Sequence, residues 1–172
     1  MQNQKSNGAH TSQRSQYFTM LGISLVICRN KEGKWLAVKE TGGRGWWVPG
    51  GLVDPPESFF EAAIRETQEE AGIDVELKGI LRTEYNINGG YQRMKLVFYA
   101  EPIDQNQKPK SVADYESDEA RWVTLQELVE MKSQKPGWRG PELYEWAKYI
   151  EDGGTIYPLH SFDREGAKIK MK

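Results

Sequence analysis

The sequence predicts a mixed α/β fold, and three observations support this. Short apolar runs of strand type, beginning with Met20 to Cys28, alternate with segments that repeat apolar residues at helical spacing. Glycine- and proline-rich turns separate these segments. The 172 residues are 38% hydrophobic and 28% charged, an ordinary composition for one globular core. We expect a disordered polar tail over residues 1–17, followed by a single domain over 18–172 that carries a C-terminal helix.

Two strands are expected first. Met20 to Cys28 is rich in Leu, Ile and Val and predicts a buried strand, in which Cys28 is a buried and unreactive core residue. The turn residues from Asn30 to Gly33 lead to a second strand from Trp35 to Lys39. We expect these two strands to pair as a hairpin.

A helix follows a glycine-rich loop, and its ends are recognisable in the sequence. Ser58 is a suitable N-cap, Glu61 completes a capping box, and Gly72 stands where a left-handed C-terminal cap is expected. At ~100° per residue the helix has one apolar face and one charged face. The apolar face is expected to hold Phe60, Ala63, Ile64, Thr67 and Ala71, and the charged face Arg65, Glu66, Glu69 and Glu70.

The remaining elements alternate in the same way. A strand pair joined by Asn88-Gly89-Gly90 is followed by a polar loop, a last strand, a short helix and a terminal helix. The strand pair is expected over Val75 to Ile87 and Tyr91 to Ala100, and the polar loop over Pro102 to Ser117. The last strand is expected over Glu119 to Val123, the short helix over Thr124 to Met131 and the terminal helix over Pro141 to Gly153. The stretch from Pro136 to Phe162 holds five Trp and Tyr residues. They could form a homodimer interface, although packing of a terminal helix on its own domain is the preferred interpretation.

The charge balance limits the classes of partner. Twenty-three Lys and Arg residues face 25 Asp and Glu residues, for a net charge of −2, and no basic block is present to follow a phosphate backbone. A polymeric nucleic acid is therefore not expected as a partner. No apolar run approaches the ~18 residues that span a bilayer, so we expect no membrane association and a cytoplasmic location.

Three glutamates on the first helix predict a metal site. Glu66, Glu69 and Glu70 stand at i, i+3 and i+4, which places their carboxylates on one side of the helix. Such a cluster repels itself unless a cation compensates it, and hard oxygen ligands without His or Cys favour Mg²⁺, with Mn²⁺ as a substitute. Taken by itself, a solvated helix face with an Arg65–Glu69 pair would be the simpler interpretation.

The spacing around these glutamates decides between the two interpretations. Gly51 is followed after five residues by Glu57, and after seven more by Arg65-Glu66-Thr67-Gln68-Glu69-Glu70-Ala71-Gly72-Ile73. This segment, Gly51 to Ile73, resembles the Nudix box of the Nudix hydrolases. It departs from the usual pattern at Thr67, where the family has an aliphatic residue, and the Thr methyl group can still pack on the sheet.

The resemblance implies a fold, a reaction and a set of roles. The fold would be an α/β/α sandwich with a mixed sheet, and the enzyme would cleave the pyrophosphate of a nucleoside di- or triphosphate, or of a nucleoside diphosphate linked to another moiety. Cleaning of damaged nucleotides from the cellular pool is the first hypothesis. Glu69 and Glu70 would be the main metal ligands, Glu66 a further ligand or one acting through water, and Glu57 an outer ligand. Arg65 would orient the glutamates, and the Gly51 carbonyl would face the metal because no Cβ obstructs it.

Residues outside the box supply candidates for the base and for substrate binding. Many family members carry an acid before the last strand, and the offset from Trp122 selects Glu116 as the base or an extra ligand, with Glu119 second. A solvated loop charge is an equal alternative for either. Arg44 and Lys39 are candidates for holding phosphates, with ordinary surface cations as the alternative. Trp46, Tyr85 and Tyr91 could stack on a base, although Trp46 is more simply a core residue.

A second class of function stays open at this point. A Nudix fold that has lost catalysis could sense a nucleotide or bind another protein. Such a module would show substitutions in the Arg-Glu-x-x-Glu-Glu segment, and positions 65 to 70 carry none. The intact set of metal ligands therefore favours the enzyme.

Overall fold

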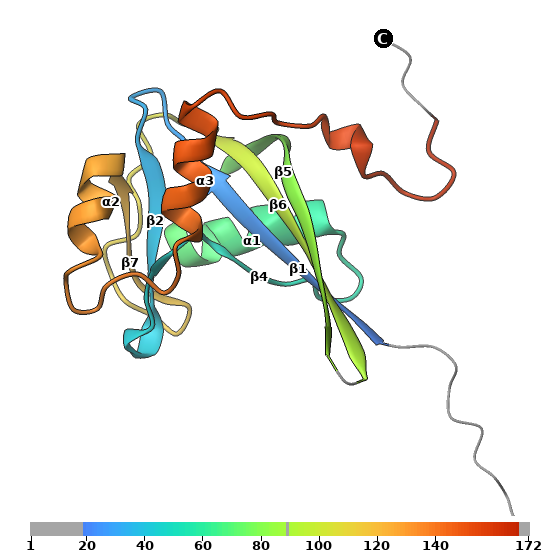
Figure 1. The fold of residues 1–172 in the computed structure, drawn as a ribbon, viewed down its shortest axis with the longest axis horizontal. Helices are drawn as coiled ribbons and strands as arrows, with labels where there is room; N and C mark the ends of the chain where they lie inside the picture. The colour runs from blue at the N-terminus through green and yellow to red at the C-terminus, as the bar shows by residue number, and fades with distance from the viewer. Residues whose placement is uncertain (1–18, 89, 169–172) are drawn as a thin grey trace, which may run out of the picture.

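The computed structural model describes residues 19–88 and 90–168, so the expected tail over 1–17 lies outside the described residues. Two sheets and three α-helices form the fold (Figure 1). One sheet has the strand order β4-β1-β6-β5, with β1 Thr19–Cys28, β4 Gly50–Leu52, β5 Val75–Asn88 and β6 Tyr91–Pro102. The other has the order β3-β2-β7, with β2 Trp35–Glu40, β3 Gly45–Trp47 and β7 Ser117–Val123. The helices are α1 Phe59–Ala71, α2 Leu125–Met131 and α3 Glu142–Glu151, with 3₁₀ turns at Thr41–Gly43 and Leu159–Ser161.

The side chains of β1 alternate between two hydrophobic cores. Leu25 and Ile27 belong to a core that includes Trp146 of α3, whereas Val26 and Cys28 belong to a core that includes residues of α1. Figure 1 shows α3 and α1 on opposite sides of the sheets. Strand β1 runs parallel to β6 and antiparallel to β4, so its sheet is mixed. The predicted α/β/α sandwich with a mixed sheet is confirmed, and Cys28 is buried as predicted.

The predicted hairpin of the first two strands is wrong. Strand β1 pairs with β4 and β6, which occupy both of its edges, while β2 pairs with β3 and β7 in the other sheet. In the described part of the chain, pairing between the two segments is limited to the isolated bridge between Arg29 and Trp35. The turn reverses the chain as expected, but long-range pairing sends the two strands into different sheets.

The predicted ends of helix α1 are confirmed. The Ser58 hydroxyl accepts a hydrogen bond from the Glu61 amide, and the Glu61 carboxylate accepts one from the Ser58 amide at 2.8 Å. Gly72 has φ 66°, and its amide donates to the Gln68 carbonyl at 2.8 Å. These caps satisfy backbone groups that the helix itself leaves free.

The expected division of α1 into an apolar and an exposed acidic face is wrong in part. Ile64 is 42% exposed, while Glu66 and Glu70 are buried with 9% and 8% exposure. The side of α1 that carries Glu66 and Glu70 is covered by the Pro49-Gly50-Gly51 turn and by the start of β7. The Gly50 amide donates to the Glu70 carboxylate, and the Ser117 hydroxyl donates to the Glu70 carbonyl.

The C-terminal helices pack on their own domain, as preferred from the sequence. Helix α2 begins with the predicted capping box of Thr124 and Glu127. Helix α3 buries Leu143, Trp146 and Ala147 in the core shared with β1. Strand β7 begins two residues earlier than expected, at Ser117. No helix in the described part of the chain combines the length and apolar character that crossing a membrane requires.

Candidate active site

A glycine turn brings the backbone against the glutamates of α1. The Pro49 carbonyl accepts a hydrogen bond from the Val26 amide at 3.0 Å, and Gly50 and Gly51 then pair with β1. An added Cβ at Gly50 would overlap the Ser24 carbonyl, and one at Gly51 would overlap the carboxylate of Glu66. Both glycines are therefore needed for this close approach, and Gly51 lies directly beside a predicted metal ligand.

Arg65 binds three of the four predicted acidic ligands. Its guanidinium donates to Glu57 at 3.0 and 2.6 Å, to Glu66 at 2.9 Å and to Glu69 at 2.9 Å. A fifth hydrogen bond runs from Arg65 Nη2 to the Leu52 carbonyl at 3.0 Å. These contacts raise the pKa of Arg65 and, chiefly through the Arg65 hydrogen bonds, lower the pKa of Glu57. Arg65 thus contacts three of the acids at once, and the orienting role that the resemblance implies stays a prediction.

Glu70 is held apart from this network. Its carboxylate accepts the Gly50 amide at 2.9 Å. Burial raises its pKa to about 8 against the lowering effect of that hydrogen bond, and the charges of Glu66, Glu40 and Glu116 raise it further. The pKa of Glu66 is raised in the same way, first by burial. Two buried carboxylates with raised pKa values form a site that would favour an added cation.

A cavity of about 340 Å³ opens beside these carboxylates and is here called the glutamate pocket. Acids, bases and an apolar wall line it together. Glu66, Glu70 and Glu116 are among its acidic residues, and Arg44, Arg93, Lys95 and Arg139 are its basic residues. The apolar wall includes Ile23, Leu25 and Trp47. A pocket lined by both acids and several cations suits a phosphate-bearing ligand that arrives with a metal ion.

Several residues predicted from the sequence lie at this pocket. Glu116 and Arg44 line it, and Gly51 forms part of its rim. Glu69 faces an adjoining cavity that Glu116 also lines, and its side chain is 36% exposed. Glu57 reaches the site through Arg65.

Four other candidates do not line the glutamate pocket. Lys39 pairs with Glu119 at 3.5 Å, on the face of β2 opposite to Glu40, and Glu119 also binds Arg121 at 2.8 Å. Trp46 is 4% exposed and belongs to the hydrophobic core, so its ring is not offered to a base. Tyr85 is 72% exposed and lines a small cavity with Arg93 and Lys95, which also line the glutamate pocket.

Sequence reasoning missed the cations supplied by neighbouring elements. Arg93, Lys95 and the core residue Val97 stand at every second position of β6, so their side chains share one face of the strand. This two-residue spacing could have been recognised in the sequence. Arg139 comes from the loop before α3, forms an ion pair with Glu40, and lies 4.0 Å from the Trp47 ring centroid. Its position depends on long-range packing and has no local signal.

The donor set suits a hard divalent cation. The acids supply carboxylate oxygens, and an added Cβ at Gly51 would fill the space that the Glu66 carboxylate occupies. In the described residues no three acidic, His or Cys side chains surround a common ion position. We attribute this to Arg65, whose guanidinium draws Glu57, Glu66 and Glu69 toward itself.

Comparison with known proteins decides the family. The model of the NUDIX domain matches residues 19–147, which cover the two sheets, α1 and α2. The chain belongs to the Nudix family. Among Nudix relatives, phosphatase NudJ of Escherichia coli strain K12 is 31% identical over 139 residues, covering 80% of this chain and 87% of the relative.

Two further Nudix relatives are longer proteins. Nudix hydrolase 5 of Arabidopsis thaliana is 30% identical over 114 residues, covering 63% of this chain and 37% of the relative. The human 8-oxo-dGDP phosphatase NUDT18 is 36% identical over 103 residues, covering 58% of this chain and 31% of the relative. The chain thus spans about a third of the length of these two relatives.

Solved structures share the Nudix fold. A NUDIX hydrolase from Nitrosomonas europaea has a TM-score of 0.66 at 19% identity, covering 87% of this chain and 100% of that one. The Bacillus subtilis pyrophosphohydrolase BsRppH has a TM-score of 0.59 at 28% identity, covering 78% and 83%.

Proposed function

We propose that this Nudix protein hydrolyses the pyrophosphate bond of a nucleoside di- or triphosphate, or of a nucleoside diphosphate linked to another moiety, with Mg²⁺ as the metal. The observation that carries the proposal is the glutamate pocket, in which buried Glu66 and Glu70 face four basic side chains. The names of the relatives support the class, since phosphatases and a pyrophosphohydrolase are among them.

In this proposal Glu66, Glu69 and Glu70 hold the metal, with Glu57 as an outer ligand and the Gly51 carbonyl beside it. Mg²⁺, or Mn²⁺ in its place, would neutralise phosphate charge and lower the pKa of a bound water. Arg65 keeps the acids in position before the metal arrives, because it already binds Glu57, Glu66 and Glu69. Binding requires those carboxylates to turn from the guanidinium toward the ion.

Glu116 is the proposed base. Two observations support this role: Glu116 lines the glutamate pocket with Glu66 and Glu70, and its charge raises the pKa values of both. Its carboxylate would take a proton from the water that attacks phosphorus. The new P–O bond then forms as the anhydride P–O bond breaks, and the leaving phosphate carries away the electron pair of that bond.

The basic side chains that line the glutamate pocket are proposed to bind the phosphates. Arg44, predicted for this role, lines the pocket at the entrance of the glycine-rich loop, together with Arg93, Lys95 and Arg139. Guanidinium groups suit this task because they bind phosphate oxygens in pairs. Lys39 is a weaker candidate, since its ammonium is paired with Glu119 outside the pocket.

A hydrolysis screen tests the proposal. Nucleoside diphosphates, triphosphates and diphosphate conjugates are incubated with the protein in Mg²⁺ or Mn²⁺, and the products are identified by mass. An oxidised guanine nucleoside diphosphate is the first compound to test, because the human relative is an 8-oxo-dGDP phosphatase. Metal-dependent release of a nucleoside phosphate supports the proposal. Binding of nucleotides without turnover anywhere in the panel would favour the catalytically inactive module instead.

A further inference from the structure

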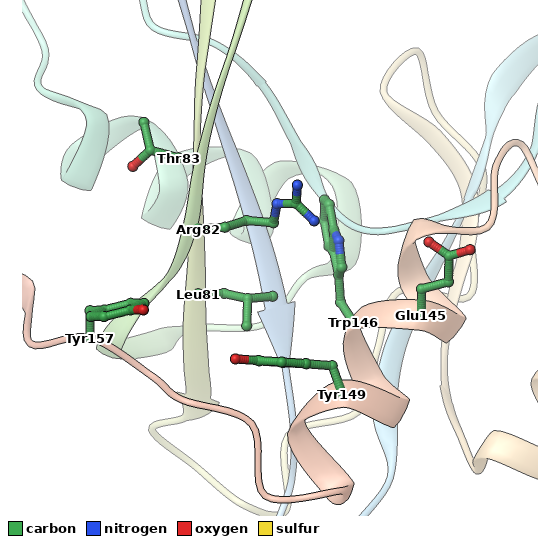
Figure 2. Close-up of a pocket in the computed structure, with 7 residues that line it drawn as sticks. All are labelled: Leu81, Arg82, Thr83, Glu145, Trp146, Tyr149 and Tyr157. Atoms are coloured by element: carbon green, nitrogen blue, oxygen red, sulfur yellow. The ribbon is translucent and has the colours of Figure 1, made fainter.

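A second and larger cavity, which shares no lining residue with the glutamate pocket, lies between β5 and α3 (Figure 2). Its volume is about 550 Å³, and we call it the aromatic pocket. Tyr149 of α3 and Tyr157 of the segment after α3 border it, with Leu81, Arg82, Thr83, Glu145 and Trp146. Tyr149 is 45% exposed and Tyr157 is 53% exposed, so both rings are accessible. The volume lies within the ~300–1,000 Å³ typical of small-molecule sites.

The ring of Tyr149 is fixed by the turn that ends α3. Its hydroxyl accepts a hydrogen bond from the Thr155 amide at 2.9 Å. Gly154 lies against the same ring, since an added Cβ there would overlap it. Tyr149 is therefore held in place without losing its exposed surface.

Tyr157 is fixed by the edge of β5. Its backbone exchanges two hydrogen bonds with Ile80, at 2.8 and 2.9 Å, which extends the sheet by one bridge. Gly79 permits this approach, because an added Cβ would overlap Ile156 and contact the Tyr157 carbonyl at 2.7 Å. The Tyr149 ring and the Tyr157 backbone are thus held by specific contacts, which reduces the ordering that ligand binding must impose.

A chain of ion pairs connects the aromatic pocket with the glutamate pocket. Arg82 binds Glu84 at 3.0 Å, and Glu84 binds Lys95 at 3.4 Å. Arg82 lines the aromatic pocket, and Lys95 lines the glutamate pocket. The two cavities therefore lie along one stretch of β5 and β6, with a cation at each end.

We propose that the aromatic pocket binds a planar aromatic ring, of the nucleobase class, on the part of the substrate that lies beyond the cleaved pyrophosphate. Exposed tyrosine rings stack on any base, because every base has a π-face. The Arg82 guanidinium would meet an adjoining phosphate. The inference rests on the proposed function for the identity of the ligand, whereas ring binding itself can be measured without catalysis.

Calorimetric titration tests the pocket directly. AMP and ribose 5-phosphate are titrated into the full chain in EDTA, where the metal site is inactive. We expect AMP to bind about fivefold or more tightly than ribose 5-phosphate, which lacks the ring. Tyr149→Ala and Tyr157→Ala should each weaken AMP binding by about fivefold or more.

Tyr91→Ala is the matched control. Tyr91 is 40% exposed and does not line the aromatic pocket, so its removal should leave AMP affinity unchanged. Circular dichroism checks the fold of each variant, and Tyr157→Ala carries the test if loss of the Thr155 hydrogen bond unfolds Tyr149→Ala. Equal binding of AMP and ribose 5-phosphate, unchanged AMP affinity in the folded tyrosine variants, or no AMP binding to the parent chain would overturn the inference.

Steady-state hydrolysis separates this inference from the proposed function. For a substrate with an aromatic ring on the part beyond the cleaved pyrophosphate, Tyr157→Ala should raise KM with kcat nearly unchanged, while a substrate without a ring on that part should be unaffected. If the parent chain hydrolyses both substrates and Tyr157→Ala changes neither reaction, the inference about the aromatic pocket is refuted and the proposed hydrolase function stands. Tyrosine-dependent AMP binding without turnover of any compound refutes the hydrolase alone.

Discussion

Arg65 and Glu57 form a two-fold hydrogen-bonded pair, with Nε to Oε2 at 3.0 Å and Nη2 to Oε1 at 2.6 Å. The pair joins the middle of α1 to the loop that precedes it. Because the same guanidinium also binds Glu66 and Glu69, the loop and the helix acids are positioned by one side chain. A planar fork is needed for this, and an ammonium cannot replace it.

We therefore expect Arg65→Lys to fold but to lose activity by roughly tenfold or more, since each charge-assisted hydrogen bond contributes about 1.5–3 kcal/mol. Arg121→Lys is the control, because Arg121 binds Glu119 through two nitrogens outside the glutamate pocket. Hydrolysis rates in saturating Mg²⁺ check this. Equal rates for Arg65→Lys and Arg121→Lys would contradict the positioning role.

The close contact of Gly51 with Glu66 leads to a second prediction. Gly51→Ala places a Cβ where the Glu66 carboxylate lies, so the carboxylate must move. We expect the variant to fold and to lose roughly 10- to 100-fold in metal affinity or activity, as for other displaced supports of a metal site. Melting temperature and Mg²⁺-dependent rate are measured together. A variant that melts lower yet keeps its rate would show that Gly51 serves the turn and not the site.

The burial of Glu70 predicts how stability depends on pH without metal. Its pKa is raised from 4.5 to about 8 on folding, so the protonated folded form is favoured at low pH. This stabilising contribution is fully present below about pH 4.5 and is lost as the pH rises through about 8. The loss is on the order of a few kcal/mol, because one unit of pKa shift corresponds to about 1.4 kcal/mol.

Denaturant unfolding in EDTA at several pH values measures this effect. The unfolding free energy of Glu70→Gln should fall less between pH 4.5 and 8 than that of the parent chain. Added Mg²⁺ should stabilise the parent chain most at the upper end of this range, where Glu70 is ionised. Parallel pH profiles for the two proteins in EDTA would count against the burial effect.

The two loop acids can be separated by amide replacement. Glu116 lines the glutamate pocket, whereas Glu119 is paired with Lys39 and Arg121. Glu116→Gln should lower kcat by roughly 10²-fold or more, because it removes the proposed base. Glu119→Gln should change kcat little. A large loss confined to Glu119→Gln would show that Glu116 is not the base.

The features that the sequence predicted well are local ones. The caps at Ser58 and Thr124 depend on residues within one helical turn, so they were readable directly. The spacing from Gly51 to Gly72 likewise lies within one loop and one helix. Its acids are gathered around Arg65 in the structure, and their role in metal binding stays a prediction.

The features that the sequence did not predict depend on long-range packing. The expected hairpin failed because β4 and β6 occupy both edges of β1. The periodicity of α1 could not show that the glycine turn would cover Glu66. It also could not show that Ile64 would stay exposed. Arg139 reaches the pocket through a loop that Trp46 anchors by two backbone hydrogen bonds, at 2.9 and 3.0 Å.

The hydrolysis rate of Glu70→Gln in saturating Mg²⁺ tests the central claim most directly. Glu70 is buried beside the glycine turn and has no part in the Arg65 network, so the amide can keep the fold. If Glu70 holds the metal, the variant should retain the melting transition of a folded protein and lose most of the parent rate, since a ligand charge supports several kcal/mol of transition-state stabilisation. A folded Glu70→Gln variant that hydrolyses the best substrate at the parent rate would contradict the account.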